Sequence, residues 1–560
     1  MVQIENLTKS YGERTIFSDV NFKIMDGEKV GIVGKNGAGK STLIKIMVGL
    51  EEYDGGKIFG LRAEDIGYAE QIPHFTKNNL LDEMTSNGVQ EFQAKKILFG
   101  LGFTESELKK NPNEFSGGET AKISLAKSLL SEPRILILDE PTNHLDIYAI
   151  DFLEELLKNY RGTVIAVTHD RHFLQNCVDK ILDMENGHAI LYPGNYEKFV
   201  QLKEERREYE LKAYEKQQEE ISKLEDFVRR NKTRASTAKR ARSRQNILDR
   251  MERLEKPPTN ETVKLNLRDA SESANRVLII EKINFKNVIK NFSAEILKGE
   301  KIGLIGKNGV GKSTLLKIIV GELKSDSGEI KIGNRVKIGY LSQGHEELNE
   351  NFSAIEELIE EFNLTTEKAR SELAKLNIFA EVADKKISAM SGGEKTRVAL
   401  AKLILTGANF LILDEPTNHL DLPAREAIEN ALKNFDGTVL IVTHDRYLLE
   451  EVTTRTITMR NEELGIRNEE SVVEGEKVYK PKNLSDKKIS SAKIKNPPKK
   501  EIQPEKIEAQ IKMAEMELKM IEHEINSAVE PEKLSELAAA HVEKIAEIDE
   551  LYTRWEEMQC

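Results

Sequence analysis

Short apolar runs bounded by glycine or polar residues recur along the chain and predict buried β-strands. The run VGIVG (30–34) is followed, after Lys40, by STLIKIMVGL, in which the apolar residues have helical spacing. The runs ILILD (135–139) and TVIAVTH (163–169) are apolar at nearly every position, which is typical of parallel strands covered on both faces. The order of strand, glycine loop and helix therefore predicts an α/β fold.

The same pattern occurs twice in the chain. GKNGAGKST (34–42) returns as GKNGVGKST (306–314), and ILDEPTNHLD (137–146) returns unchanged at 412–421. Three further motifs return in the same order: IGYAEQ as IGYLSQ, SGGE, and THDR. A repeat of this length indicates a duplicated domain, and we expect the two copies at residues 1–192 and 263–470.

The glycine-rich stretch GxxxxGK[ST] between a strand and a helix predicts a nucleotide-phosphate site. Backbone N–H groups wrap the phosphate oxygens, the lysine (Lys40 or Lys312) reaches the β- and γ-phosphates, and the serine (Ser41 or Ser313) ligates Mg²⁺. A chance match on a glycine-rich turn is the alternative, and two occurrences in the same context argue against it. The residues predicted to contact nucleotide here are Gly34, Lys35, Asn36, Gly37, Ala38, Gly39, Lys40, Ser41, Thr42, Gly306, Lys307, Asn308, Gly309, Val310, Gly311, Lys312, Ser313 and Thr314.

An acidic pair at a strand end and a histidine at another strand end indicate hydrolysis. Asp139 and Asp414 end apolar strands, where a carboxylate can lie in the second shell of Mg²⁺, and the glutamate that follows can orient or deprotonate a water. The histidine of each T-H-D motif is placed where an imidazole can touch the γ-phosphate. A solvated turn before proline and a structural histidine are the alternatives, and the repeat favours catalysis. The predicted catalytic residues are Glu140, Glu415, His169 and His444.

Together these motifs resemble those of ATP-binding-cassette (ABC) ATPases: a phosphate loop, a Q-loop glutamine (Gln71, Gln343), an SGGE signature, DEPTNHLD and THDR. Two such domains in one chain, with NHLD and THDR in both, resemble the F subfamily (ABC-F), which contains soluble translation factors and ribosome-protection proteins. The resemblance implies ATP and Mg²⁺ as cofactors, ATP hydrolysis, and head-to-tail closure. Each ATP would then lie between one phosphate loop and the opposite signature.

The resemblance implies two ATP sites, which we call site one and site two. Site one would combine Lys40, Ser41, Gln71, Asp139, Glu140 and His169 with Ser391, Gly392, Gly393 and Glu394. Site two would combine Lys312, Ser313, Gln343, Asp414, Glu415 and His444 with Ser116, Gly117, Gly118 and Glu119. The implied Mg²⁺ contacts are Ser41, Gln71 and Asp139 in site one and Ser313, Gln343 and Asp414 in site two.

Two sequence differences predict that the sites are unequal. The first signature has Thr120 and Lys122 where the second has Lys395 and Arg397, which predicts weaker electrostatics in site two. Tyr11 stands where an adenine-stacking aromatic is expected. The second copy is about four residues shorter in this region, and Phe285 is the candidate substitute.

Residues 193–262, between the two domains, predict a helical hairpin. A long run without glycine or proline extends to about Arg230, and a second helical pattern extends from about Ala238 to Glu255, before Pro257 and Pro258. The turn carries RRNKTRASTAKRARSR (229–244), which contains no acidic residue.

The basic turn predicts contact with nucleic-acid phosphates, because arginine binds phosphate through two N–H groups and stacks on bases. A solvated face or flexible linker is the plain alternative, and a lipid surface is weaker because the turn has no apolar face. The family resemblance favours RNA, with the hairpin against the ribosome near the tRNA acceptor stem and the peptidyl-transferase region. The predicted RNA contacts are Arg229, Arg230, Lys232, Arg234, Lys239, Arg240, Arg242 and Arg244.

Composition and the C-terminal residues complete the predicted organisation. The 560 residues carry a formal net charge of -12, with no apolar run of membrane-spanning length and no secretory signal pattern, so we expect a cytoplasmic protein. Residues 471–500, rich in lysine and proline, predict a tether, and residues 501–560 have the heptad spacing of a coiled-coil hairpin. We expect a monomer in which the two ABC domains pair.

Four functions remain open from the sequence. The first is an ATPase that binds the ribosome and regulates translation through the hairpin. The second is a ribosome-protection factor that confers antibiotic resistance by the same mechanism, and the short turn mildly disfavours it. The third is the ATP-binding subunit of a transporter with a separate membrane partner, and the fourth is a DNA-associated ATPase. The third leaves the basic hairpin unexplained, and the acidic C-terminal residues disfavour the fourth.

Overall fold

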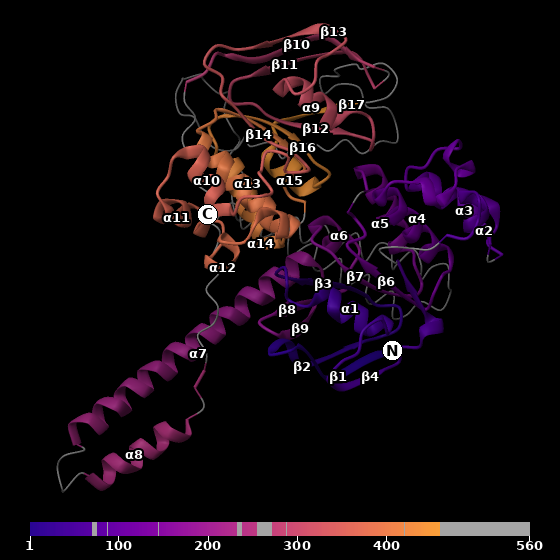
Figure 1. Ribbon diagram of the computed structural model, residues 1–560. Coiled ribbons are helices and arrows are strands. Elements are labelled where there is room, and N and C mark those ends of the chain that lie inside the picture. Colours follow the sequence, from indigo (N-terminus) through magenta and orange to yellow (C-terminus); the bar gives the residue numbers. More distant parts are fainter. Residues whose placement is uncertain are drawn as a thin grey trace, which may run out of the picture. The chain divides into compact units, whose positions relative to one another are not determined.

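Two α/β domains of the same architecture, joined by a pair of long helices, make up the part of the chain that the computed structural model describes (Figure 1). The described residues are 1–69, 75–86, 88–143, 145–231, 238–251, 253–254, 272–286, 288–418 and 420–459. We call β1 to β9 with their helices the first domain, and β10 to β17 with theirs the second domain. The predicted tether and coiled-coil hairpin, from residue 471 on, lie outside the described residues.

A six-stranded sheet forms the centre of the first domain, in the order β5-β6-β7-β3-β8-β9. Its strands are β3 (Lys29–Gly34), β5 (Ile66–Tyr68), β6 (Ile135–Asp139), β7 (Thr163–Val167), β8 (Lys180–Glu185) and β9 (His188–Pro193). All neighbours pair in parallel except β9, which runs antiparallel to β8. Successive residues of β6 pack into different cores, Ile135 into one and Leu136 into the other. The prediction of strands covered on both faces is confirmed.

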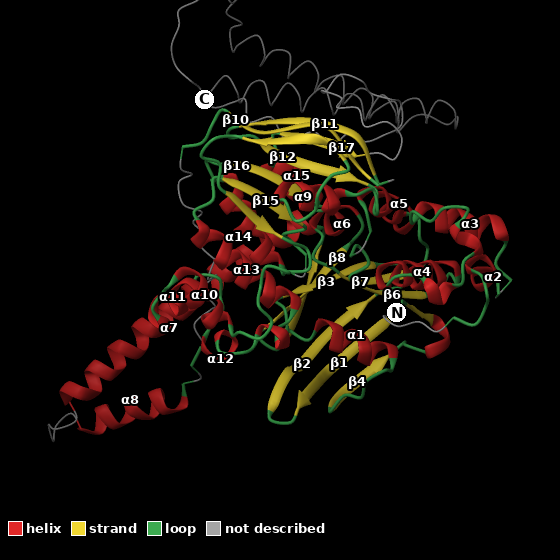
Figure 2. Ribbon diagram, turned by 45° about the horizontal axis from the view of Figure 1, so that its top comes forward, coloured by secondary structure: helices red, strands yellow, loops and turns green. Residues whose placement is uncertain are grey.

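An antiparallel sheet and a layer of helices cover the two faces of this central sheet. The antiparallel sheet has the order β2-β1-β4, with β1 (Val2–Tyr11), β2 (Arg14–Ile24) and β4 (Gly55–Phe59). Figure 2 shows these strands as yellow arrows beside α1. Helix α1 (Lys40–Val48) packs in the core on the side of the antiparallel sheet. The helices of the other face are α2 (Leu80–Thr85), α3 (Glu91–Gly100), α4 (Gly117–Leu130), α5 (Ile147–Lys158) and α6 (Arg171–Asn176). Short 3₁₀ turns lie at Ala63–Asp65, Glu107–Lys109 and Pro112–Glu114.

The second domain repeats this arrangement. Its central sheet has the order β14-β15-β16-β12-β17, and its antiparallel sheet has the order β11-β10-β13. The strands are β10 (Arg276–Phe285), β11 (Ile289–Leu297), β12 (Lys301–Gly306), β13 (Ser327–Ile332), β14 (Ile338–Leu341), β15 (Phe410–Asp414), β16 (Thr438–Val442) and β17 (Arg455–Met459). The helices are α9 (Lys312–Val320), α10 (Ala354–Phe362), α11 (Thr366–Ala374), α12 (Ala380–Ala383), α13 (Gly392–Thr406), α14 (Leu422–Lys433) and α15 (Arg446–Val452), with a 3₁₀ turn at Ile387–Ala389.

The four-residue difference between the copies lies in the first hairpin of each domain. In the first domain Lys9 pairs with Phe17, and the hairpin continues to Tyr11. In the second domain Phe285 already pairs with Ile289, next to the turn. Phe285 therefore corresponds to Lys9, and its ring packs against the apolar core. The prediction that Phe285 replaces Tyr11 is wrong, because Phe285 pairs at the position of Lys9 and not two residues further along the strand.

Two helices, α7 (Tyr196–Asn231) and α8 (Ala238–Arg250), connect the domains and lie side by side away from the sheets (Figures 1 and 2). Ile221, Val228 and Leu248 form a small buried cluster between them. The predicted hairpin is confirmed, but α8 ends at Arg250 rather than near Glu255. Beyond it, the backbone N–H of Leu254 donates a 2.8 Å hydrogen bond to the side chain of Gln217 on α7, so the chain has already left the helix. None of the helices among the described residues is long and apolar enough to span a membrane.

Candidate active sites

Two clefts lie between the domains, and residues of both domains line each one. The first, of about 750 Å³, combines the phosphate loop of the first domain with the SGGE motif of the second, and the other, of about 860 Å³, has the reverse composition. Predicted residues that line the first cleft are Asn36, Gly37, Gly39, Lys40, Ser41, Thr42, Asp139, Glu140, His169, Ser391, Gly392, Gly393 and Glu394. Those that line the second cleft are Lys307, Asn308, Gly309, Gly311, Lys312, Ser313, Thr314, Gln343, Asp414, Glu415, His444, Ser116, Gly118 and Glu119. Apart from Gln71 and Gly117, the structure thus brings together the sets that the sequence assigned to sites one and two.

The remaining predicted loop residues support the clefts from behind. Ala38 packs against one apolar core and Val310 lies within another. Gly117 is the first residue of α4, and Gln71 lies outside the described residues. In site one the Lys40 ammonium donates to the carbonyls of Gly34 (2.7 Å) and Lys35 (3.1 Å). In site two the ammonium of Lys312 makes the same bonds to the carbonyls of Gly306 (2.8 Å) and Lys307 (3.1 Å).

Each phosphate loop is shaped for an anion. Gly39 has a φ of 94°, and a Cβ built there would lie 2.6 Å from the side chain of Ile16, so only glycine fits. Gly37 borders open space, which leaves its backbone accessible to a ligand. The buried Lys40 has a lowered pKa because of burial, and the carboxylates of Glu140, Asp421 and Asp139 oppose that effect. A buried ammonium beside a loop whose glycine backbone is open to a ligand fits the phosphates of a nucleotide.

The glutamate after each aspartate adopts a strained backbone conformation. Glu140 has a φ of 48° and Glu415 has a φ of 52°, in the left-handed region that residues with side chains seldom occupy. A hydrogen bond from each backbone N–H to the neighbouring strand holds this conformation, at 2.8 Å to the carbonyl of Val167 or of Val442. Backbone strain of this kind is retained where a side chain must be aimed, and here it turns the carboxylates into the clefts.

A histidine lies beside each of these glutamates. His169 Nε2 is 3.6 Å from Glu140 Oε1, and His444 Nε2 is 3.5 Å from Glu415 Oε1. Burial raises the pKa of Glu140 to about 7, whereas it lowers the pKa of His169 well below its usual value and that of His444 to about 3. The imidazoles are therefore neutral at pH 7. A buried carboxylate of raised pKa is a better general base than a solvated one, which suits activation of a water.

Several polar atoms in the clefts lack a hydrogen bond among the described residues. They include both ring nitrogens of His169, Oδ1 of Asp414, Oε1 of Glu415 and Nδ1 of His444. Buried polar groups of folded proteins are normally satisfied, so this set fits a polar ligand. The residues also fit Mg²⁺. Burial raises the pKa of Asp139 and of Asp414, and a hydrogen bond from Ser41 or Ser313 opposes that effect. A hydroxyl beside a carboxylate offers the oxygen ligands that Mg²⁺ prefers.

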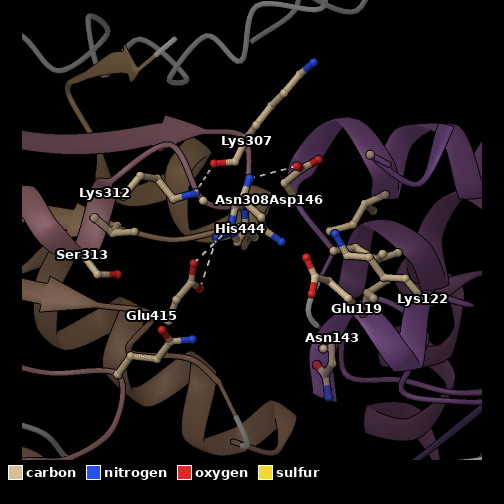
Figure 3. Close-up of a pocket in the computed structure, with 18 of the residues that line it drawn as sticks. Glu119, Lys122, Asn143, Asp146, Lys307, Asn308, Lys312, Ser313, Glu415 and His444 are labelled. Atoms are coloured by element: carbon tan, nitrogen blue, oxygen red, sulfur yellow. Dashed lines mark hydrogen bonds and ion pairs between the residues drawn. The ribbon is translucent and has the colours of Figure 1, made fainter. Parts of the chain in front are cut away.

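The SGGE motifs cap the helices that face the opposite phosphate loops. Ser116 and Glu119 form a capping box at the start of α4, and Ser391 and Glu394 form one at the start of α13. In Figure 3, Glu119 and Lys122 of the first domain face Lys312, Ser313 and Glu415 of the second. Each cleft therefore closes between a phosphate loop and the N-terminus of a helix from the other domain.

Weaker electrostatics in site two stays a prediction, but the contacts of Lys395 remove one of its two grounds. Lys395 forms an ion pair of 3.1 Å with Glu350 on its own domain. Lys122 lines site two and Arg397 lines site one, so α4 and α13 each supply one cation to a cleft. The difference between Thr120 and Lys395 therefore does not set the charge of the two sites.

Tyr11 has partners at the edge of its own sheet. Its hydroxyl hydrogen-bonds the carboxylate of Glu51, and the ammonium of Lys9 lies 4.9 Å from its ring centroid. The nearby cleft residues are Arg14 and Ile16 in site one, and Val288 borders site two. Adenine stacking by Tyr11 stays a prediction.

Sequence reasoning missed the residues that join the domains at the clefts. The N–H of Asn308 donates a 3.1 Å hydrogen bond to Asp146, and the N–H of Asn36 donates one of 3.2 Å to Asp421. Both aspartates also cap the helix that follows them, α5 or α14. Their place before a helix signals the cap in the sequence, but the partner across the interface is visible only in the structure.

Comparisons with known proteins agree with this geometry. A family model described as ABC transporter matches residues 17–143 and 289–418, and a second model with that description matches residues 182–267. Putative ATP-binding protein YdiF of Bacillus subtilis (strain 168) is 36% identical over 82% of this chain and 80% of its own length. ABC transporter F family member 5 of Arabidopsis thaliana is 33% identical, over 82% of this chain and 75% of its own.

A solved structure shows the same tandem fold. The complex of archaeal ribosomal stalk protein aP1 with ribosome recycling factor aABCE1 contains a chain that matches with a TM-score of 0.55 and 21% identity, over 81% of this chain and 87% of that one. The fold and the paired clefts define a tandem ABC ATPase, which binds ATP and hydrolyses it. Within that class, the chain belongs to the ABC-F family.

Proposed function

We propose that this ATPase acts on the ribosome in the cytoplasm. The ATP-bound form, with its domains closed, binds the ribosome and inserts the α7–α8 hairpin towards the tRNA and the peptidyl-transferase region, thereby regulating translation. Hydrolysis removes the γ-phosphate that bridges the two domains, and the protein leaves. The proposed acting species is a monomer, and the site residues have the roles that the sequence assigned to them.

The hairpin is the observation that carries this proposal. The 36-residue α7 is about 54 Å long at ~1.5 Å per residue, which is enough to reach well beyond the domains. Apolar contacts among Ile221, Val228 and Leu248 hold α8 against it, so the hairpin is a braced arm rather than a loose linker. A braced arm of this length between two ATPase domains is suited to contact a partner far from the ATP sites.

The positive charge near the end of the hairpin supports an RNA partner, although three of its arginines also make contacts within the hairpin. Arg229 and Arg230 lie 2.5 and 3.7 Å from Asp226, so part of their charge is compensated. The guanidinium of Arg244 lies 3.9 Å from the ring centroid of Phe227 and braces α8 on α7. Arg242 is exposed. Lys232 and Arg234 lie outside the described residues, as do the side chains of Lys239 and Arg240.

The base of the hairpin is fixed to the first domain and touches the second. The ammonium of Lys203 on α7 lies 2.6 Å from Asp183 and 2.9 Å from Glu185, at the end of β8. The Tyr196 hydroxyl, in the first turn of α7, lies 3.3 Å from Glu426 on α14. A change in how the two domains pair therefore reaches the first turn of the arm directly.

The proposed catalytic cycle uses this chain's own groups in both sites. Lys40 and Lys312 bind the phosphates, and Glu140 and Glu415 orient and deprotonate the water, with the neutral His169 and His444 fixing the carboxylates. Ser41 and Asp139, or Ser313 and Asp414, would hold Mg²⁺, which would supply positive charge against the phosphate oxygens. Gln71 and Gln343 are its remaining proposed contacts.

A double substitution tests the proposal. Glu140→Gln with Glu415→Gln keeps ATP bound but removes the base, so we expect ATP-dependent cosedimentation with ribosomes and inhibited translation. Lys40→Ala with Lys312→Ala is the matched control, because it removes ATP binding and should leave the protein off the ribosome. If the double glutamine protein sediments free of ribosomes in ATP, the ribosomal role is wrong.

Drug susceptibility of cells that carry the wild type or the double glutamine protein separates the two ribosomal roles. Resistance that depends on the wild-type protein and is lost in the double variant would indicate ribosome protection. Inhibited translation without a change in susceptibility would indicate general regulation.

A further inference from the structure

Arg425 occupies a position that breaks the equivalence of the two ATP sites. It lies on α14, four residues after Asp421, and the repeat places Ile150 at the same position of α5. Its side chain is 11% exposed and lines the first cleft, to which it comes from the opposite domain. It also borders the second cleft, where it belongs to the same domain as the phosphate loop. Ile150 is buried in the apolar core of the first domain and borders the second cleft. Site one therefore has a cation from the opposite domain where site two has an aliphatic side chain.

The contacts of Arg425 cross the domain interface to the histidine of site one. Its Nη1 donates a 3.2 Å hydrogen bond to the backbone carbonyl of His169. Its Nε donates one of 3.0 Å to the carbonyl of Leu420, and Asp445 lies 3.6 Å from Nη1. The guanidinium is thus held by its own domain on two sides and directed at the other domain on the third.

The start of α14 is set firmly against the first domain. Leu422, in the first turn, belongs to the apolar core of the first domain although it is part of the second. Its counterpart Ile147 is buried too, but it is not among the residues of the second domain's cores. Arg425 follows one turn later, so its approach to His169 depends on how the domains pair.

We propose that Arg425 is a positioning residue for site one: by bonding the His169 carbonyl across the interface, it aligns His169 with Glu140 only when the two domains are paired. At the equivalent position of site two, the side chain of Ile150 cannot donate a hydrogen bond. In both sites the backbone N–H of the histidine bonds the glutamate of its own domain, at 3.3 Å from His444 to Glu415, so the bond from Arg425 is an addition in site one. The rate of hydrolysis therefore depends more strongly on domain closure in site one than in site two. The charge of Arg425 also lowers the pKa of Glu140 against the larger effect of burial, in agreement with its proximity.

Single-site proteins test this inference, which rests on the assignment of Glu140 and Glu415 to separate sites. Glu415→Gln leaves site one and Glu140→Gln leaves site two, and single-turnover hydrolysis of ATP is measured in each. Arg425→Ile, which installs the site-two residue, should lower the maximal single-turnover rate of site one about tenfold. The protein concentration that gives half of that rate should change less than threefold. The loss in site two should be at least fivefold smaller. Arg425→Lys, which keeps one donor, should recover at least a third of the site-one rate.

Equal losses in both sites would show a general role in the interface and overturn the inference. A site-one rate within twofold of the parent after Arg425→Ile, or no recovery with Arg425→Lys, would also overturn it. The protein with both glutamates replaced sets the baseline. Hydrolysis at the parental rate in that protein would refute the site assignment, and with it the inference. Binding of a fluorescent ATP analogue, which does not require hydrolysis, shows that each variant is folded.

Discussion

The guanidinium of Arg171 lies 2.7 Å from the carboxylate of Glu429, across the interface between the two ABC domains, with side chains only 6% and 10% exposed. The repeat provides the reciprocal pair, in which Arg446 bonds Glu154 of the first domain. Both arginines come from the THDR motif, two residues after the histidine that we propose is catalytic. The motif therefore has a second role in the structure, because its arginine ties the domains together beside the active site.

Removing one partner of this ion pair should loosen the domain interface. Glu429→Gln removes the nearer carboxylate and leaves the buried Arg171 with the half-exposed Glu426 at 3.9 Å. Removing one partner of a buried pair costs about 3–5 kcal/mol in comparable cases. We expect weaker ATP-induced closure, measured as the distance distribution between one label on each domain, and slower hydrolysis in both sites.

Glu426→Gln is the matched control for that change. Glu426 is 52% exposed and lies 3.9 Å from Arg171, so its loss should have a much smaller effect on closure. Equal effects of Glu426→Gln and Glu429→Gln would contradict the importance of the buried pair.

The packing of α8 on α7 should depend on the few apolar side chains buried between these two helices. Leu248→Ala removes a side chain that is 7% exposed between α7 and α8, and a buried leucine of this kind contributes about 2–3 kcal/mol. We expect faster limited proteolysis within residues 196–250 while ATP hydrolysis without ribosomes stays unchanged. Ile247→Ala, at a position that is 50% exposed, should leave the proteolysis rate close to that of the wild type. Unchanged proteolysis of Leu248→Ala would contradict the packing of α8 on α7.

Residues whose position depends on nearby strands and helices could be predicted from the sequence. Contacts between the two domains could not. Lys40, Glu140 and His169 lie in motifs whose spacing from strands and helices defines their place, and the repeat doubled that signal. Arg425 and Asp146 contact the other domain far along the chain, and no spacing within one copy reveals such a partner. The end of α8 was missed for a similar reason, because a tertiary bond to Gln217 takes the chain out of the helix before any proline.

The charge at the end of the hairpin leads to the last prediction. Replacing Arg240 and Arg242 with Gln removes two positive charges near the turn, in the segment that we propose contacts RNA. Ribosome binding should weaken, and the slope of log affinity against log salt concentration should fall by about 1.4–1.8, because each phosphate contact contributes about 0.7–0.9 to that slope. Ribosome binding is measured by sedimentation over a series of salt concentrations, in the background with Glu140 and Glu415 both replaced by Gln.

Lys212→Gln with Lys223→Gln is the matched control, since these lysines are 74% and 77% exposed on the same α7 but lie in i,i+4 pairs with Glu208 and Glu219. The control should keep the salt dependence of the parent protein, because those charges are compensated along the helix and lie nearer the domains. If the salt-dependence slope falls equally in both double variants, ribosome binding depends on the overall charge of the hairpin. Only a fall specific to the Arg240 and Arg242 variant supports RNA contact at the turn.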